Sequence, residues 1–315
     1  MPALEADETF GFDPYAIAAA HLSPAARAAL GGLQEALTGI RPLLARAWET
    51  ATMPAAILDV LVPLDLMQPA GVDPAEAASS VYSGLRNYVL ARADVSVATL
   101  YNAQSGLFRT AVALGGSPEQ AAELDPAIRT FDLKGVFALT EPDHGSDVAG
   151  GLATTARRLG DVGDWVIDGS KTWIGGAFGS DVLVVFARDV ADHAVKAFLV
   201  PTEAEGVGLE KIEGKVSLRP MQNARISLDG VPVREASRLQ KVNGWRDVAR
   251  ILRAMRSDVA WIAAGLQAGA LDAAVRYVRE REQFGRPIGG FQLVQEKIAR
   301  MLGNTAASLA LVAAL

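Results

Sequence analysis

The chain has 315 residues, of which 50% are hydrophobic and 21% are charged, and its formal net charge at pH 7 is -6. This length and composition predict a soluble, folded protein with more than one packed unit, and an acidic chain without a long run of lysine and arginine is not expected to bind nucleic acid. The absence of cysteine excludes disulfides, thiolate nucleophiles and sulfur-ligated metals, and the three histidines, His21, His144 and His193, lack the spacing of metal ligands.

The two ends of the chain carry no sign of a membrane or export signal. Residues 1–12 are acidic and lack a basic segment followed by an apolar one, so neither a secretory signal nor a transit peptide is expected and the predicted location is cytoplasmic. The most apolar stretch, residues 305–315, is shorter than the roughly 20 residues that a membrane-spanning helix needs. We interpret it as part of a buried helix.

Residues 1–132 are expected to form a helical domain. Three segments in it begin with a capping side chain followed by proline, at Ser23, at Asp73 and at Ser117. Between Val81 and Arg92 the apolar residues recur at helical spacing.

Residues 133–240 are expected to form a β-domain. An Asp168-Gly169 turn is predicted to join two short strands, residues 165–167 and 171–174, in a hairpin. Further strands are predicted from short apolar or β-branched runs at residues 135–140, 182–187, 197–200 and 224–228.

Residues 241–315 are expected to form two long helices. One apolar stripe runs from Val248 to Leu266 and the helix continues towards Arg281, a Gly-Arg-Pro break follows at 285–287, and a second helix begins near Phe291. So short a connection predicts antiparallel packing. The last helix has no stop signal, and two helices cannot cover apolar faces this wide, so the pattern predicts at least two more helices from a missing part or from another chain.

Two segments of the β-region are candidates for a ligand site. Residues 137–147 lead from a strand into a turn where Gly145 permits close approach, and Thr140 and Ser146 could hydrogen-bond to the polar edge of a planar ring. An ordinary surface turn would have the same composition. Trp173, which is followed by a glycine pair, could stack on a flat ligand or belong to the β-core. Neither of the glycine-rich nucleotide-binding fingerprints occurs.

Taken together, these segments resemble the acyl-CoA dehydrogenase family. The motifs are T-E-P-x-x-G-S-D at 140–147, D-G-x-K-x-W-I at 168–174 and R-x-x-F-G-x-P-I-x-x-F-Q at 281–292. Within the family, residues 218–223 and 281–285 are most similar to the branch of glutaryl-CoA dehydrogenases and short-chain acyl-CoA oxidases. The resemblance implies a mainly helical α+β protein with an N-terminal helical domain, a central β-barrel domain and a C-terminal four-helix bundle around FAD. Two helices of that bundle are present, as in a C-terminally truncated member.

The resemblance also implies roles for individual residues. Ser146 would touch the substrate as well as the flavin, and Arg256 would lie near the acyl-CoA. The residues that would line the flavin are Phe137, Leu139, Thr140, Gly145, Ser146, Trp173, Ile174 and Gly175. Gly175 stands where the family commonly has threonine, which predicts weaker FAD binding.

Further positions would reach the FAD of a neighbouring subunit, namely Arg281, Phe284 and Gln292, which implies a homodimer, a homotetramer or a heteromer. Without the family, Arg281 would be interpreted as a solvated charge and Arg256 as a partner in a local salt bridge, although the spacing to Asp258 disfavours that pair.

The resemblance implies α,β-desaturation of an acyl-CoA thioester, with an electron-transfer flavoprotein or oxygen as acceptor. That reaction needs a carboxylate base, yet one family position for it holds Met255 and the commoner one falls beyond the end of this chain. Glu141, Asp143 and Asp147 are expected to hydrogen-bond locally instead, so no catalytic residue is predicted.

The substrate and the alternatives follow from the same resemblance. A dicarboxylyl substrate is disfavoured, because Ala91 and Ala98 stand where glutaryl-CoA dehydrogenases carry a glutamate and an arginine. The alternatives are a non-catalytic or partner-dependent flavin-binding subunit, an acyl-CoA oxidase, or the same fold with another small ligand.

Overall fold

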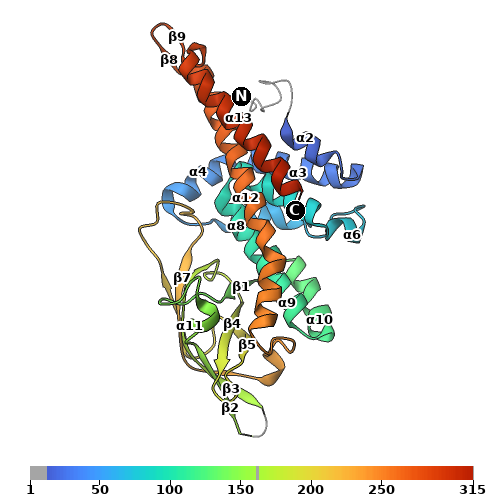
Figure 1. The fold of residues 1–315 in the computed structure, drawn as a ribbon, viewed down its shortest axis with the longest axis vertical. Coiled ribbons are helices and arrows are strands. Elements are labelled where there is room, and N and C mark those ends of the chain that lie inside the picture. The colour runs from blue at the N-terminus through green and yellow to red at the C-terminus, as the bar shows by residue number, and fades with distance from the viewer. Residues whose placement is uncertain (1–12, 161–162, 315) are drawn as a thin grey trace. The chain divides into compact units, whose positions relative to one another are not determined.

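The computed structural model describes residues 13–160 and 163–314, which divide into two compact units. The first holds the described residues up to Ala45, Ala55–Thr99 and the residues from Ser257 on, and the second holds Arg46–Pro54 and Leu100–Arg256. The mainly helical α+β class is confirmed (Figure 1). The predicted domain boundaries at 132 and 240 stay predictions, because these two units are defined by contacts and alternate along the chain.

Three N-terminal helices, α3, α6 and α10, begin where their capping residues predict. Ser23 Oγ accepts a hydrogen bond from Ala26 N at 3.1 Å, and Asp73 caps its helix in the same way. Ser117 and Gln120 form a reciprocal capping box. The helices up to the β-region are α2 (Pro14–Ala19), α3 (Pro24–Gly39), α4 (Arg41–Thr50), α5 (Ala55–Leu61), α6 (Pro74–Ala77), α7 (Ser80–Ala93), α8 (Val95–Asn102), α9 (Arg109–Gly115) and α10 (Pro118–Arg129).

The two predicted C-terminal helices are confirmed as α12 (Trp245–Glu280) and α13 (Gln292–Ala313). Between them the chain reverses in a hairpin of β8 (Glu282–Gln283) and β9 (Arg286–Pro287), and Figure 1 shows α13 lying beside α12. The interpretation of residues 305–315 as buried helix is only partly right. Thr305, Leu309 and Val312 are buried, but Leu311 is 68% exposed, because the neighbouring helices cover only one face of α13.

The second unit contains a curled seven-stranded sheet in the order β1-β4-β2-β3-β7-β6, with β5 paired to β4. Its central strand β4 is buried on both faces, because successive side chains alternate between two apolar cores. The strands are β1 (Gly135–Ala138), β2 (Thr155–Leu159), β3 (Asp164–Gly175), β4 (Val182–Asp189), β5 (Val195–Pro201), β6 (Val207–Lys211) and β7 (Asn223–Val233). A short helix, α11 (Val148–Gly151), follows β1.

The predicted hairpin at Asp168-Gly169 is wrong, because both segments belong to the single strand β3. The pairing of β3 with β7 shifts register between Ile167 and Gly169, where Asp168 alone faces two residues of β7, so the Asp-Gly pair continues the strand and the extra residue of the bulge lies on β7. Gly169 has a φ of 150°, and a Cβ at this position would lie 2.6 Å from Thr154 Oγ1. Glycine is therefore required here for close approach rather than for chain reversal.

No helix in the described ranges is both long enough and apolar enough to cross a membrane. Residues 1–12, for which the sequence predicts no targeting signal, lie outside the described residues.

Candidate ligand-binding site

The turn that follows β1 is closed by its own backbone. Glu141 N donates to His144 O at 3.1 Å, and His144 N donates to Glu141 O at 3.3 Å. Gly145 and Ser146 are exposed beyond this closure, and a Cβ on Gly145 would meet no atom within 4 Å. In the described part of the chain, the hydroxyls of Thr140 and Ser146 make no hydrogen bond. The turn therefore offers open backbone and two hydroxyls to a ligand.

A buried ion pair fixes the base of this turn. Lys171 Nζ lies 2.7 Å from Glu141 Oε1, and the two side chains are 0% and 4% exposed. Lys171 also donates to Phe186 O at 2.7 Å, and Glu141 accepts from Thr154 N at 2.9 Å and from Ala153 N at 2.6 Å. One charged pair thus joins the turn to β3, to β4 and to the segment before β2.

Both charges of the pair persist at neutral pH. Burial lowers the pKa of Lys171 to about 8, against the opposing effect of Glu141. Burial alone would raise the pKa of Glu141, but the charge of Lys171 and the hydrogen bonds from Lys171, Thr154 and Ala153 lower it overall. Glu141 is therefore an ionised structural carboxylate. The expectation that its side chain hydrogen-bonds locally is wrong, because its partners Ala153, Thr154 and Lys171 lie 12 to 30 residues away along the chain.

Trp173 lies beside the turn with its ring in solvent. Its side chain is 57% exposed, its φ is 61°, and a second register shift between Lys171 and Ile174 places it on a bulge of β3. The preceding peptide is tied to the turn, because Thr172 N donates to Thr140 O at 2.9 Å. A bulge next to a site commonly re-aims a side chain. The prediction that Trp173 ends a hairpin strand is wrong, and so is its alternative as a core residue.

The remaining residues predicted around the flavin are largely structural. Leu139 and Ile174 are buried in the two cores of the sheet, so only their backbone atoms could reach a ligand. Phe137 packs against Phe186 with ring centroids 4.7 Å apart. At Gly175 a Cβ would lie 2.5 Å from Met221 Cε, so the thioether fills space that a larger residue would need.

His144 is paired within the turn. Its Nδ1 lies 2.9 Å from Asp147 Oδ2, and its ring covers Gly151, where a Cβ would lie 2.1 Å from Nδ1. The hydrogen bond that the His144 ring donates to the Asp147 carboxylate raises the pKa of His144. Because His144 is half-buried and Asp147 is exposed, the pair stiffens the turn without adding a fully buried charge.

The three residues predicted to reach the FAD of a neighbouring subunit all belong to the first unit. Phe284 is 94% exposed at the tip of the β8–β9 hairpin, and Arg281 and Gln292 are exposed on either side of it. Arg256 is exposed on α12, as the last residue of the second unit.

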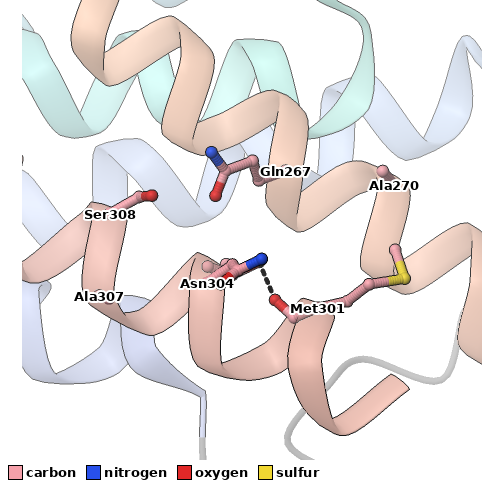
Figure 2. Close-up of a pocket in the computed structure, with 7 residues that line it drawn as sticks. Gln267, Ala270, Met301, Asn304, Ala307 and Ser308 are labelled. Carbon is pink, nitrogen blue, oxygen red and sulfur yellow. Dashed lines mark hydrogen bonds between the residues drawn. The ribbon is translucent and has the colours of Figure 1, made fainter. Parts of the chain in front are cut away.

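A separate hollow of about 440 Å³ opens between α12 and α13. Figure 2 shows Gln267 on one helix facing Asn304 and Ser308 on the other. None of the predicted site residues lines it.

The site fits a planar aromatic group such as the isoalloxazine of FAD. The exposed ring of Trp173 lies beside the turn that carries Gly145 and the hydroxyls of Thr140 and Ser146. The buried ion pair of Lys171 and Glu141 fixes this turn.

Sequence reasoning missed Lys171 and Thr154, which support the turn, and Asn223 and Lys215, since Asn223 Nδ2 donates to Trp173 O at 2.9 Å and Lys215 donates to Asn223 Oδ1. Lys171 could have been found from its position, because a lysine on the core-facing side of a strand needs a buried partner.

Comparison with known proteins places these features in a family. The middle domain of acyl-CoA dehydrogenases matches residues 136–231, and their C-terminal domain matches residues 242–315. Among curated proteins, 3-(aryl)acrylate reductase from Clostridium sporogenes is 38% identical over 226 residues, which are 69% of this chain and 59% of that protein. The chain thus spans less than two thirds of the length of that relative.

Solved structures agree over more of the chain. Glutaryl-CoA dehydrogenase from Mycobacterium smegmatis superposes with a TM-score of 0.84 at 34% identity, covering 98% of this chain and 78% of that one. A glutaryl-CoA dehydrogenase from the same organism in complex with FADH2 gives 0.84 at 29% identity, covering 93% and 75%.

Proposed function

The chain belongs to the acyl-CoA dehydrogenase family, and on that premise we propose that it binds FAD and an acyl-CoA thioester for α,β-desaturation. The observation that carries the proposal is Trp173, a large aromatic side chain held 57% exposed on a strand bulge beside the open turn. An exposed ring on an irregular backbone is costly unless a ligand covers it.

The proposal assigns a role to Gly145, Thr140 and Ser146 of the turn and to Trp173 beside it. Gly145 lets the ligand approach the backbone, and the hydroxyls of Thr140 and Ser146 hydrogen-bond to its polar edge. Trp173 covers one face of the ring and excludes water. Bound FAD would supply the acceptor for the hydride that leaves the β-carbon.

The α-proton needs a base that we do not assign to the turn. Glu141 is held by Lys171 and by two backbone N–H groups, so it is neither free to reach a substrate nor basic enough to take its proton. Position 255 holds a methionine, 4% exposed in an apolar core. We therefore expect this chain on its own to bind substrate without desaturating it.

The substrate proposed is a monocarboxylic acyl-CoA. Ala91 and Ala98, at the positions that suggest dicarboxylyl recognition in relatives, are both buried and apolar. The arginine next to Ala91 is not available either, because Arg92 donates to Asp13 at 2.8 Å and to Asp272 at 2.7 Å. Arg92 is therefore already paired with two carboxylates of its own unit.

FAD binding is the first test. We expect the 315-residue chain to bind FAD, and Trp173→Ala to weaken binding about tenfold or more, since aromatic stacking on a base contributes about 1–3 kcal/mol. Trp48→Ala is the matched control, because Trp48 is 43% exposed in the same unit and lies under Arg219 instead. Equal FAD affinity of both variants, or no FAD binding at all, would refute the proposal.

The chemistry is tested by anaerobic titration of the flavin-loaded chain with butyryl-CoA and glutaryl-CoA. We expect the flavin band to shift on binding of butyryl-CoA but not to bleach, and glutaryl-CoA to bind more weakly. Bleaching would show that a base is present after all. Admission of oxygen or of an electron-transfer flavoprotein to reduced protein then identifies the acceptor.

A second candidate is a partner-dependent flavin-binding subunit. It is favoured by apolar side chains on the first unit that are largely in water, with Leu293 81% and Val259 65% exposed. Light scattering with size-exclusion chromatography distinguishes this subunit from the first candidate, because a stable monomer at micromolar concentration would contradict a need for a partner. This candidate also includes homodimers and homotetramers, in which Arg281, Phe284 and Gln292 would reach the FAD of a neighbour.

A further inference from the structure

The backbone at Trp173 needs support from outside its own strand. A positive φ of 61° is unfavourable for a residue with a bulky side chain. At this bulge the pairing jumps from Lys171 opposite Ile226 to Ile174 opposite Ala224, so the peptide of Trp173 has lost its regular ladder partner. Some other group has to hold its carbonyl in place.

Asn223 supplies that group. It is the first residue of β7, and its Nδ2 donates to Trp173 O at 2.9 Å. The amide thus replaces the ladder hydrogen bond that the bulge removed. Fifty residues separate the two along the chain.

Lys215 determines which way the amide points. Its Nζ donates to Asn223 Oδ1, to Met221 O and, at 2.8 Å, to Leu218 O. An ammonium group has no acceptor, so the oxygen of Asn223 must face Lys215 and its NH₂ must face Trp173. The loop between Lys215 and Asn223 is also joined to the strand, because Gly176 N donates to Gln222 O at 3.2 Å.

We propose that Asn223 and Lys215 are positioning residues that hold the Trp173 ring over the site assigned to FAD. This inference rests on the proposed function for its ligand, but the geometry that carries it lies within the second unit. It also explains residues 218–223, which resemble one branch of the family, because three of them accept hydrogen bonds from Lys215.

The first measurement is fluorine NMR of the 315-residue chain labelled with 5-fluorotryptophan, with the Trp173 resonance assigned from Trp173→Phe. We expect that resonance to shift or broaden in Asn223→Ala, in Asn223→Asp and in Lys215→Met. Asn223→Asp keeps an acceptor for Lys215 but replaces the donor to Trp173 by a negatively charged acceptor. Gln222→Ala is the control, because the Gln222 side chain makes no hydrogen bond within the described ranges.

The second measurement is FAD titration with visible circular dichroism of the bound flavin. We expect the three variants to raise the dissociation constant about three- to tenfold, as the loss of one hydrogen bond implies, and to change the flavin dichroism, while the control matches the unmodified chain. Far-UV circular dichroism checks that each variant is folded.

Each outcome is decisive. An unchanged Trp173 resonance in all three variants would overturn the inference, and so would a changed resonance with unaltered FAD affinity and dichroism. If the unmodified chain binds no FAD, the proposed function fails, and the fluorine spectra still decide whether Asn223 and Lys215 hold Trp173.

Discussion

Lys171→Met isolates the buried ion pair beneath the turn. The ammonium is 0% exposed and donates to Glu141 and to the carbonyls of Phe186 and Leu139. Its removal leaves the Glu141 carboxylate buried beside an apolar group, and breaking a buried pair in this way costs about 3–5 kcal/mol. That is a large part of the roughly 5–15 kcal/mol that stabilises a typical domain.

The assay is urea unfolding at pH 7, with the circular dichroism of the unmodified chain as reference. Arg225→Met is the control, because Arg225 pairs with Glu210 on the same sheet at 3.4 Å with both side chains mostly in water, and exposed pairs contribute about 0–1 kcal/mol. If Lys171→Met lowers the free energy of unfolding no more than Arg225→Met does, the reasoning is refuted. The double variant with Glu141→Gln should recover part of the loss, because it removes the unpaired charge.

The stability that Lys171→Met removes should also depend on pH. In the unmodified chain the pKa of Glu141 is lowered below its ordinary 4.5, so its stabilising contribution is present above 4.5 and is lost as pH falls through the lowered value. Without Lys171, burial raises that pKa instead. The destabilisation by Lys171→Met should therefore shrink as pH falls from 7 towards 4.5. A constant difference across this range would contradict the assigned charge of Glu141.

Two further predictions concern the helices and the turn. Gly265→Ala should destabilise the chain by about 1–3 kcal/mol, because the new Cβ would lie 2.3 Å from Tyr88 O. Gly303→Ala should instead stabilise it by about 0.5–1 kcal/mol, because a Cβ there meets no atom within 4 Å. Thermal melts in which both variants shift the melting temperature in the same direction would count against this packing. His144 should titrate above 6.5, and its ion pair should be lost as pH rises through that raised pKa; proton NMR of His144 should show a drop in pKa for Asp147→Asn, and an unchanged value would disprove the pairing.

Local signals explain what the sequence predicted well. The starts at Ser23 and Ser117 depend on a side chain and backbone groups no more than three residues apart. The long helix α12 follows from an apolar repeat of helical period. The strands with an apolar or β-branched run, such as β4, were predicted, whereas β2, with Arg157 and Arg158 in its five residues, has no such run and was missed.

The sequence by itself therefore determined the fold class, the helix starts at Ser23, Asp73 and Ser117, and the motifs of the family. Only the tertiary structure decided how the candidate site is supported. Lys171 meets Glu141 across 30 residues and Asn223 meets Trp173 across 50, and neither partner carries a local mark of the other. Asp168-Gly169 has the composition of a turn, yet the pairing of β3 on both sides keeps it extended. Hydrogen bonds between strands distant in sequence, which no short window contains, decided these features.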